Sequence, residues 1–215
     1  MPILKIGFPL LYGILFLWPG YVFFSHSGRV IFSPGTTFVQ LNLRLFSLVG
    51  LYAFWSVWAQ LIIGSNMRWL RPRLPWLYGF HRKEGVFALI FSVLHPLMLL
   101  IGSGLDQFIG FFSVSNKFYI YIWMGLVQLL LLGVTGLTEL FMKLPWLRTR
   151  WRTIHYLNYM VFVLVWLHSW NLGSYVRSTS LRFFWIFCLV SAAASTVGRI
   201  TRAIIQFRRR TMSRV

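Results

Sequence analysis

Six long apolar stretches constrain this sequence more than any other feature. They cover residues of about 4–24, 45–66, 80–104, 118–141, 154–174 and 183–204. Each is close to the roughly 20 residues that an α-helix needs to cross the hydrocarbon core of a bilayer. A helix also satisfies its own backbone polar groups, which lipid cannot do. We therefore expect an all-α integral membrane protein, a single domain over residues 1–215 that forms a six-transmembrane-helix bundle.

The composition supports the membrane class and argues against a nucleic-acid-binding protein. The 215 residues are 58% hydrophobic and only 11% charged, whereas soluble domains have about 25% charged residues. The formal net charge is +18, but the basic residues cluster at the ends of the apolar stretches. There they act as topology signals and contact lipid headgroups. No basic amphipathic reading element is present, so we expect membrane lipid and no nucleic acid as a partner.

The distribution of basic residues predicts the orientation. With the N-terminus inside, sixteen of the 21 lysines and arginines fall on the inner side, and the outer side holds only Arg29, Arg44, Lys117, Arg177 and Arg182. This split follows the positive-inside rule. Both termini are therefore expected in the cytoplasm, and the third and fifth helices should both run from inside to outside.

Four of the five histidines form two pairs within these two helices. His95 follows His81 by 14 residues and His168 follows His155 by 13, which is roughly 20 Å along a helix axis. His81 and His155 should lie near the inner face, and His95 and His168 nearer the outer face. Imidazole is a common axial ligand of haem iron, so the pattern predicts two bis-histidine haems b between helices three and five. The alternative is that the histidines make ordinary polar contacts between helices.

The spacing in the fifth helix does not fit an ideal helix. At 100° per residue, a separation of 13 leaves His155 and His168 about 140° apart around the axis. Two explanations remain open: His155 sits at a frayed helix start, or a π-bulge restores the phase.

Other residues predict no catalytic site, and we assign no catalytic residue. The sequence contains no carboxylate pair, Ser–His–Asp set, phosphate-binding glycine loop or zinc motif. Glu84 is expected at the start of a helix, where an acid is favourable, and Glu139 is expected to pair with Lys143 at i+4. Cys188, the sole cysteine, is expected to be a small packing residue, and His26 to be a surface residue of the first outer loop. The tryptophans near the span ends should be interface anchors.

Several of these runs resemble the ferric reductase-like transmembrane domain family. They are HRKEG at 81–85 and LHPL at 94–97 for the third helix, GLT at 136–138 for the fourth, and WRTIHYLNY at 151–159 with His168 and LG at 172–173 for the fifth. The family includes ferric reductases, the membrane part of NADPH oxidases, and the haem-binding subunit of a bacterial methionine sulfoxide reductase system. The resemblance implies that His81 and His155 hold an inner haem, and that His95 and His168 hold an outer one.

By this reading the chain is a transmembrane oxidoreductase component, a cytochrome b of the bacterial inner (plasma) membrane. Arg82 and Arg152 are placed to pair with haem propionates, which suit the forked guanidinium. The outer acceptor would be a ferric chelate, dioxygen or a periplasmic reductase. The rival hypothesis is a haem-free transporter or scaffold whose histidines relay protons.

The resemblance also bears on the electron donor. Relatives with a fused dehydrogenase continue into an FAD- and NAD(P)H-binding module, whereas this sequence ends soon after the sixth apolar stretch. We therefore expect a separate cytoplasmic flavin reductase or dehydrogenase carrying FAD or FMN, or a quinol, to supply electrons, unless the sequence is the membrane part of a longer protein.

Overall fold

The computed structural model describes residues 2–31, 33–140 and 145–212, and in these ranges the chain is almost entirely helical and contains no strand. Its elements are α1 (Pro2–Ile31), α2 (Phe38–Leu70), α3 (Leu77–Ser103), α4 (Leu105–Gly110), α5 (Tyr119–Leu140), α6 (Pro145–His155), α7 (Leu157–Leu172), α8 (Ser174–Ser178) and α9 (Leu181–Met212). The prediction of an all-α fold is confirmed.

Five helices in the described ranges are long and apolar enough to cross a membrane, which indicates a multi-pass membrane protein. They lie at Leu4–Gly28, Phe38–Leu70, Leu77–Ser103, Tyr119–Thr138 and Leu181–Arg208. The expected span at 154–174 is not among them, because the helix is interrupted at Tyr156 and α7 has only 16 residues. At 1.5 Å per residue, α7 is about 24 Å long, which is shorter than a hydrocarbon core of about 30 Å.

The first two helices extend beyond the apolar stretches that predicted them. α1 continues to Ile31, so His26 lies on an exposed helix turn and not in a loop as expected. α2 begins at Phe38 because Thr37 and Gln40 form a capping box, in which each side chain bonds the other's backbone N–H. The expected loop at 25–43 is therefore reduced to the connection between Ile31 and Phe38.

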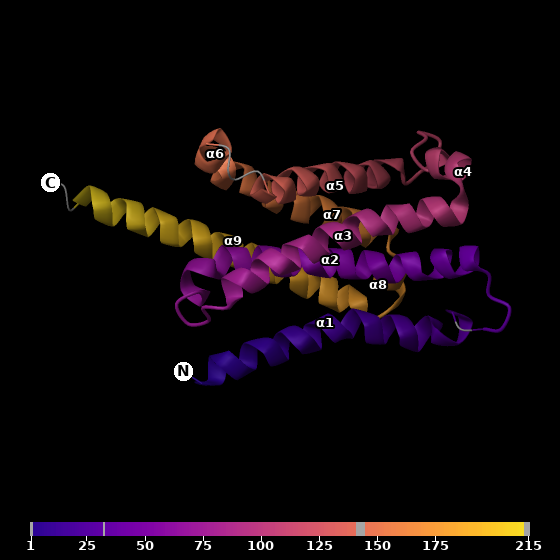
Figure 1. Cartoon of the computed structure of the whole chain (residues 1–215), viewed down its shortest axis with the longest axis horizontal. Coiled ribbons are helices and arrows are strands. Elements are labelled where there is room, and N and C mark those ends of the chain that lie inside the picture. Colours follow the sequence, from indigo (N-terminus) through magenta and orange to yellow (C-terminus); the bar gives the residue numbers. More distant parts are fainter. Residues whose placement is uncertain (1, 32, 141–144, 213–215) are drawn as a thin grey trace.

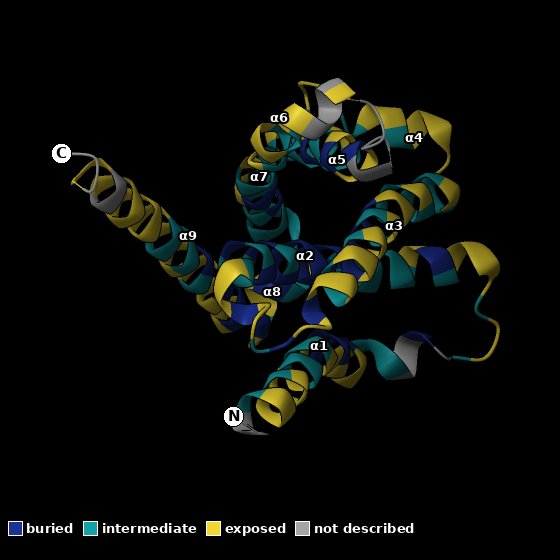
Figure 2. Cartoon of the chain, turned by 60° about the vertical axis from the view of Figure 1, so that its left-hand side comes forward, coloured by how far each residue is buried: buried dark blue, intermediate teal, exposed yellow. Residues whose placement is uncertain are grey.

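α2 is the central helix of the bundle. It packs most extensively on α3 and also contacts α1, α7 and α9. In Figure 2 its middle part is dark blue and lies among these neighbours. Trp55 and Trp58, which were among the tryptophans expected to be interface anchors, are instead buried in the core. Cys188 is fully buried in the same core, as predicted for a packing residue.

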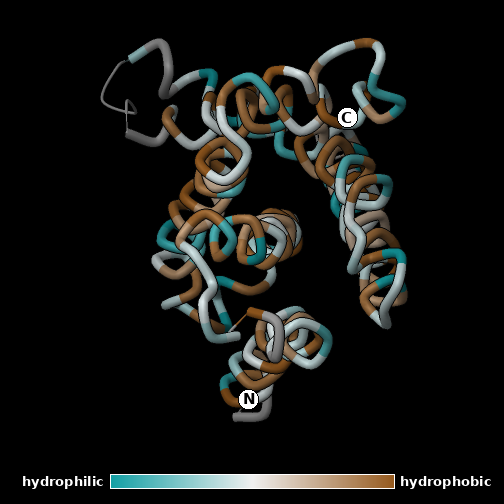
Figure 3. Tube along the Cα trace, turned by 90° about the vertical axis from the view of Figure 1, so that its right-hand side faces the viewer, coloured by the Kyte–Doolittle hydropathy of each residue, from teal (hydrophilic) through white to brown (hydrophobic). Residues whose placement is uncertain are grey.

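The outer surface of the bundle is apolar, as expected for helices that face lipid. Figure 3 shows hydrophobic (brown) positions distributed around the long helices and not confined to their inner sides. Large side chains such as Leu10, Ile14 and Phe183 are well exposed. In water such surface would be costly, at about 25 cal/mol per Å², whereas lipid covers it at no such cost.

The two ends of the bundle can be told apart in Figure 1. Both chain termini and α6 lie at one end, which we call the α6 end, and α4 lies at the other, the α4 end. α3 and α7 both run from the α6 end toward the α4 end. The expectation that these two helices are parallel is therefore met.

Candidate functional site

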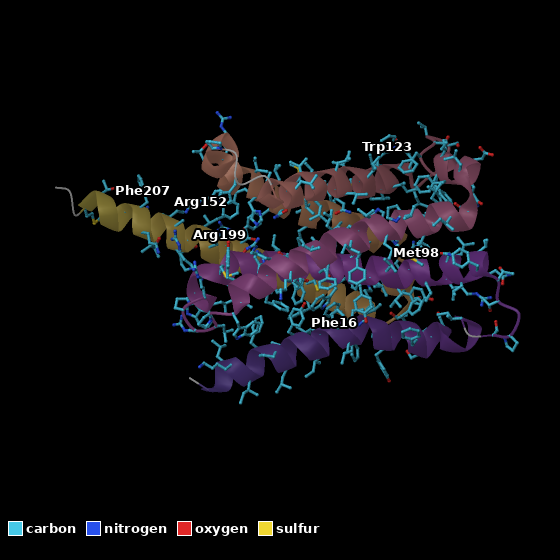
Figure 4. The ribbon with its side chains drawn as sticks, in the orientation of Figure 1. Phe16, Met98, Trp123, Arg152, Arg199 and Phe207 are labelled. Carbon is cyan, nitrogen blue, oxygen red and sulfur yellow. The ribbon has the colours of Figure 1, made fainter. Side chains whose placement is uncertain are left out.

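His95 of α3 and His168 of α7 face each other inside the bundle. Their ring centroids are 6.4 Å apart and their planes are perpendicular, at 89°. Met98, one turn after His95, and Trp123 of α5 mark this region in Figure 4. The two histidines are 73 positions apart in the sequence, so the fold itself brings them together.

Each of these two imidazoles forms a hydrogen bond to a backbone carbonyl of a neighbouring helix. His95 Nδ1 lies 2.8 Å from the backbone oxygen of Phe46 on α2, and His168 Nδ1 lies 2.8 Å from that of Tyr121 on α5. Because a carbonyl only accepts, Nδ1 must carry the proton and donate it. Nε2 of each ring then holds the lone pair that a metal requires. A histidine whose other nitrogen donates to a carbonyl is the usual arrangement for a metal ligand.

Glycine makes both of these contacts possible. Gly50, one turn after Phe46, lies under the His95 ring, and Gly125, one turn after Tyr121, lies under the His168 ring. A Cβ at Gly50 would come within 2.7 Å of His95, and one at Gly125 within 2.6 Å of His168. Real Cβ atoms do not approach other atoms so closely, so only glycine lets each ring reach the carbonyl.

The separation of the rings fits a metal ion between them. A metal–nitrogen bond to histidine is about 2 Å long. Two opposed imidazoles that share one ion therefore have centroids about 6 Å apart, once the roughly 1 Å from each nitrogen to its ring centre is added. The observed 6.4 Å is compatible with this distance, and it also lies within the roughly 4.5–7 Å of ordinary edge-to-face ring contacts.

The helices that carry these rings are held by different partners. α3 packs on α2, and α7 packs on α5, while contacts between α3 and α5 are far fewer. The site therefore lies between two helix pairs, α2–α3 and α5–α7, and each histidine reaches inward from one pair.

The second pair, His81 and His155, lies toward the α6 end. The two rings are close enough to interact electrostatically, and the His155 ring packs on Trp151 at 5.0 Å between centroids. Gly64 of α2 lies against His81, with 3.4 Å between its virtual Cβ and the ring. His81 Nδ1 is buried with no hydrogen-bond partner in the described part of the chain.

The interruption at Tyr156 accounts for the irregular spacing of His155 and His168. His155 is the last residue of α6, and α7 starts two residues later. The two histidines thus belong to separate helices, and the 140° offset of an ideal helix does not apply. This corresponds to the first of the two explanations, a histidine outside the regular start of the helix.

Glu84 does not lie at the start of a helix, as the sequence predicted. α3 begins seven residues earlier, at Leu77, and the Glu84 side chain is only 4% exposed. It accepts a hydrogen bond from Gln60 Nε2 of α2, which also donates to the backbone oxygen of His81, 2.8 Å away. Glu84 turns inward because Gln60 offers the polar partner that a buried carboxyl needs.

The two arginines assigned to haem propionates, Arg82 and Arg152, are both exposed. The sequence analysis did not single out Arg199 of α9, which is half-buried and contacts Tyr156 and Tyr159. Its Nη1 donates to Tyr159 Oη at 2.9 Å, and its guanidinium lies 5.0 Å from the Tyr156 ring centre. Arg152 and Arg199 both lie toward the α6 end in Figure 4. The only sequence signal for Arg199 was its place within an otherwise apolar stretch.

Two further expectations have different outcomes. The Glu139–Lys143 pair lies outside the described residues and side chains. Within the described ranges, no group of three or more His, Cys, Asp or Glu side chains is placed to hold a metal ion, so the candidate ligands are paired imidazoles.

Comparison of the chain with protein-family models, curated proteins and solved structures finds no match.

Proposed function

We propose that this chain is a membrane cytochrome b, similar to the ferric reductase-like family, that carries electrons across the membrane through two bound haems b. In this proposal the apolar α7 forms the sixth crossing, with the arginine-rich α6 at its cytoplasmic end, and haem binds between α3 and α7. Haem, when bound, supplies one-electron redox chemistry. The chain provides the axial ligands, their depth and an apolar surrounding.

One observation carries the proposal: the opposed pair His95 and His168. Both rings donate from Nδ1 to a backbone carbonyl, which leaves Nε2 of each as the metal-binding nitrogen. The 6.4 Å between the ring centroids leaves room for one metal ion bound by both rings. The glycines beneath the rings, Gly50 and Gly125, let each ring reach its carbonyl.

His81 and His155 support a second haem at another depth. His81 of α3 contacts Gly64 of α2, with 3.4 Å between the ring and a virtual Cβ, whereas the ring of His95 leaves no room for a Cβ at Gly50. Gly50 and Gly64 are 14 residues apart, as are His95 and His81. α2 therefore places one glycine beside each histidine of α3, at two depths about 20 Å apart along the axis.

The distribution of basic residues indicates the direction of electron transfer in this proposal. The arginines of α6 and of the last turns of α9 gather at the α6 end, which the positive-inside rule places in the cytoplasm. Electrons would enter there from a cytoplasmic flavin reductase or dehydrogenase, or from a quinol. They would leave at the α4 end to a ferric chelate, dioxygen or a periplasmic reductase.

The alternative, a haem-free transporter or scaffold with proton-relay histidines, has one observation in its favour. Glu84 is a buried carboxyl within an apolar helix, and its Oε1 has no partner in the described part of the chain. Intramembrane ionisable groups of this kind mark proton pathways in transporters. The visible absorption of the purified protein distinguishes the two functions. A folded, monodisperse preparation without haem absorption would leave only the alternative.

The experiment that tests the proposal uses proteoliposomes of uniform orientation. A flavin reductase with NAD(P)H and free flavin is added on the α6 side, and a membrane-impermeant ferric chelate on the other. We expect ferrous iron to form only when donor and acceptor are on opposite sides and the chain is present. His168→Ala should abolish this activity. Activity that survives His168→Ala, or that needs donor and acceptor on one side, would contradict it.

A further inference from the structure

A small cavity lies where α7, α8 and α9 meet, toward the α4 end. Its volume is about 200 Å³, and it is lined by Trp170, Val176, Arg177 and Arg182. Val176 is almost fully buried, while both arginines are exposed. The cavity is thus lined by two apolar side chains, Trp170 and Val176, and by two arginines.

These two arginines have no carboxylate partner in the described structure. The whole chain contains only three acidic residues: Glu84 is bonded to Gln60, Glu139 belongs to the far end of α5, and Asp106 lies on the exposed α4. Arg182 lies over the Trp170 ring at 5.5 Å, a contact that orients its guanidinium but leaves its charge uncompensated. Two like charges beside one cavity repel each other, and a bound anion would offset this repulsion.

The size of the cavity limits what can bind. Sites for drug-sized ligands and cofactors measure about 300–1,000 Å³, so 200 Å³ is too small for a nucleotide or flavin. It suits a single oxyanion group, and guanidinium groups bind phosphate and carboxylate oxygens in a bidentate fashion.

The geometry points to an oxyanion-binding site formed by Arg177 and Arg182, which takes one phosphate or carboxylate group at the α4 end. The group could belong to a free anion or to the headgroup of an anionic phospholipid, because the guanidinium groups recognise the same oxygens in both. The site is separate from the histidine pairs and does not depend on haem.

The test uses the full chain in detergent and in lipid nanodiscs. In the first arm, inorganic phosphate is titrated at constant ionic strength, because general screening also affects exposed charges, and the unfolding temperature is followed. Saturation should raise it by about 2–4 °C. In the second arm, native mass spectrometry measures how much phosphatidylglycerol stays bound after release from nanodiscs.

Single substitutions locate the site. Arg177→Gln and Arg182→Gln should each weaken binding at least about tenfold in whichever arm shows binding. Lys117→Gln removes the same charge from an exposed position at the same end and should change binding less than about twofold. Arg177→Lys should bind with intermediate affinity, because lysine keeps the charge but loses the forked geometry.

A shift with phosphate that these substitutions abolish supports a free-anion site, and one retained phosphatidylglycerol per chain supports a headgroup site. Binding in neither arm would overturn the inference. An equal loss in Arg177→Gln and Lys117→Gln would also overturn it, since net charge alone would then explain binding.

Discussion

At the scale of single residues, the candidate site depends on glycines as much as on histidines. Each outer histidine reaches a carbonyl on the neighbouring helix only because the residue one turn later has no side chain. The histidines stand out in the sequence as polar residues in apolar stretches. Gly50 and Gly125 do not, because a glycine in a membrane helix is common and its neighbour across the bundle is unknown until the fold is known.

We predict that Gly50→Ala and Gly125→Ala each displace one histidine ring and remove the outer haem. The added methyl group would sit within 3 Å of the ring, and such overpacking typically costs about 1–3 kcal/mol. Haem content per chain, measured as the pyridine haemochrome, should fall from about two to about one. Gly133→Ala is the control on α5, since a Cβ there meets nothing within 4 Å. Full haem content in Gly125→Ala would refute the role assigned to these glycines.

The Tyr159 hydroxyl joins three helices, and its removal should destabilise the α6 end. It accepts from Arg199 at 2.9 Å and lies 3.0 Å from Ser65 Oγ. Tyr159→Phe would leave a half-buried guanidinium without this acceptor, at a cost of about 1–3 kcal/mol. The unfolding temperature in detergent should fall by several degrees. Tyr156→Phe is the control because its ring lies under the same guanidinium but is exposed; an equal loss in both variants would contradict this account.

At the scale of helices, the sequence located most of the long elements but not their ends. Hydropathy falls where the chain leaves the lipid. The helix itself can continue into water, because polar residues are also compatible with helical backbone hydrogen bonds. Ser25 and His26 illustrate this, since both bond the backbone oxygen of Val22 within α1. The break at Tyr156 was not predictable from hydropathy, although the irregular spacing of His155 and His168 indicated that an ideal helix would not suffice.

Gln60 of α2 forms two polar links to α3, to Glu84 and to the backbone oxygen of His81, and we predict that it positions His81. In Gln60→Ala, the buried Glu84 carboxyl and the His81 carbonyl would both lose this donor. The free energy of unfolding should fall by about 1–3 kcal/mol, and loss of haem should affect the inner site first. Spectra of the reduced haems and thermal unfolding measure both effects. Gln107→Ala, in the exposed α4, is the control, and unchanged inner haem with lowered stability would limit Gln60 to a structural role.

At the scale of the whole molecule, the bundle has a charged end and an apolar body, which predicts its orientation. Both termini lie at the α6 end, which should face the cytoplasm. A reporter enzyme that is active only outside should work when inserted in the loop at 111–117 and fail at the C-terminus. The reverse pattern would exchange the inner and outer haems and the side at which the donor acts.

The sequence also predicted which histidines would lie close together. On two parallel helices, histidines with nearly equal spacing lie at matching depths. His95 and His168 are brought together as expected, and His81 and His155 lie near each other. What it could not predict is how the rings are held, since the carbonyls of Phe46 and Tyr121 belong to helices that carry no histidine. Arg199 was also missed, because its partners Tyr159 and Tyr156 are about 40 residues away in the sequence.

The central claim is that two pairs of histidines each hold one haem, and haem stoichiometry tests it most directly. Pyridine haemochrome analysis of the purified, monodisperse chain should give about two haems b per chain. His95→Ala and His168→Ala should each give about one, with the remaining haem still reducible by dithionite. A folded chain that binds no haem, or a stoichiometry that none of the four histidine substitutions changes, would contradict the account.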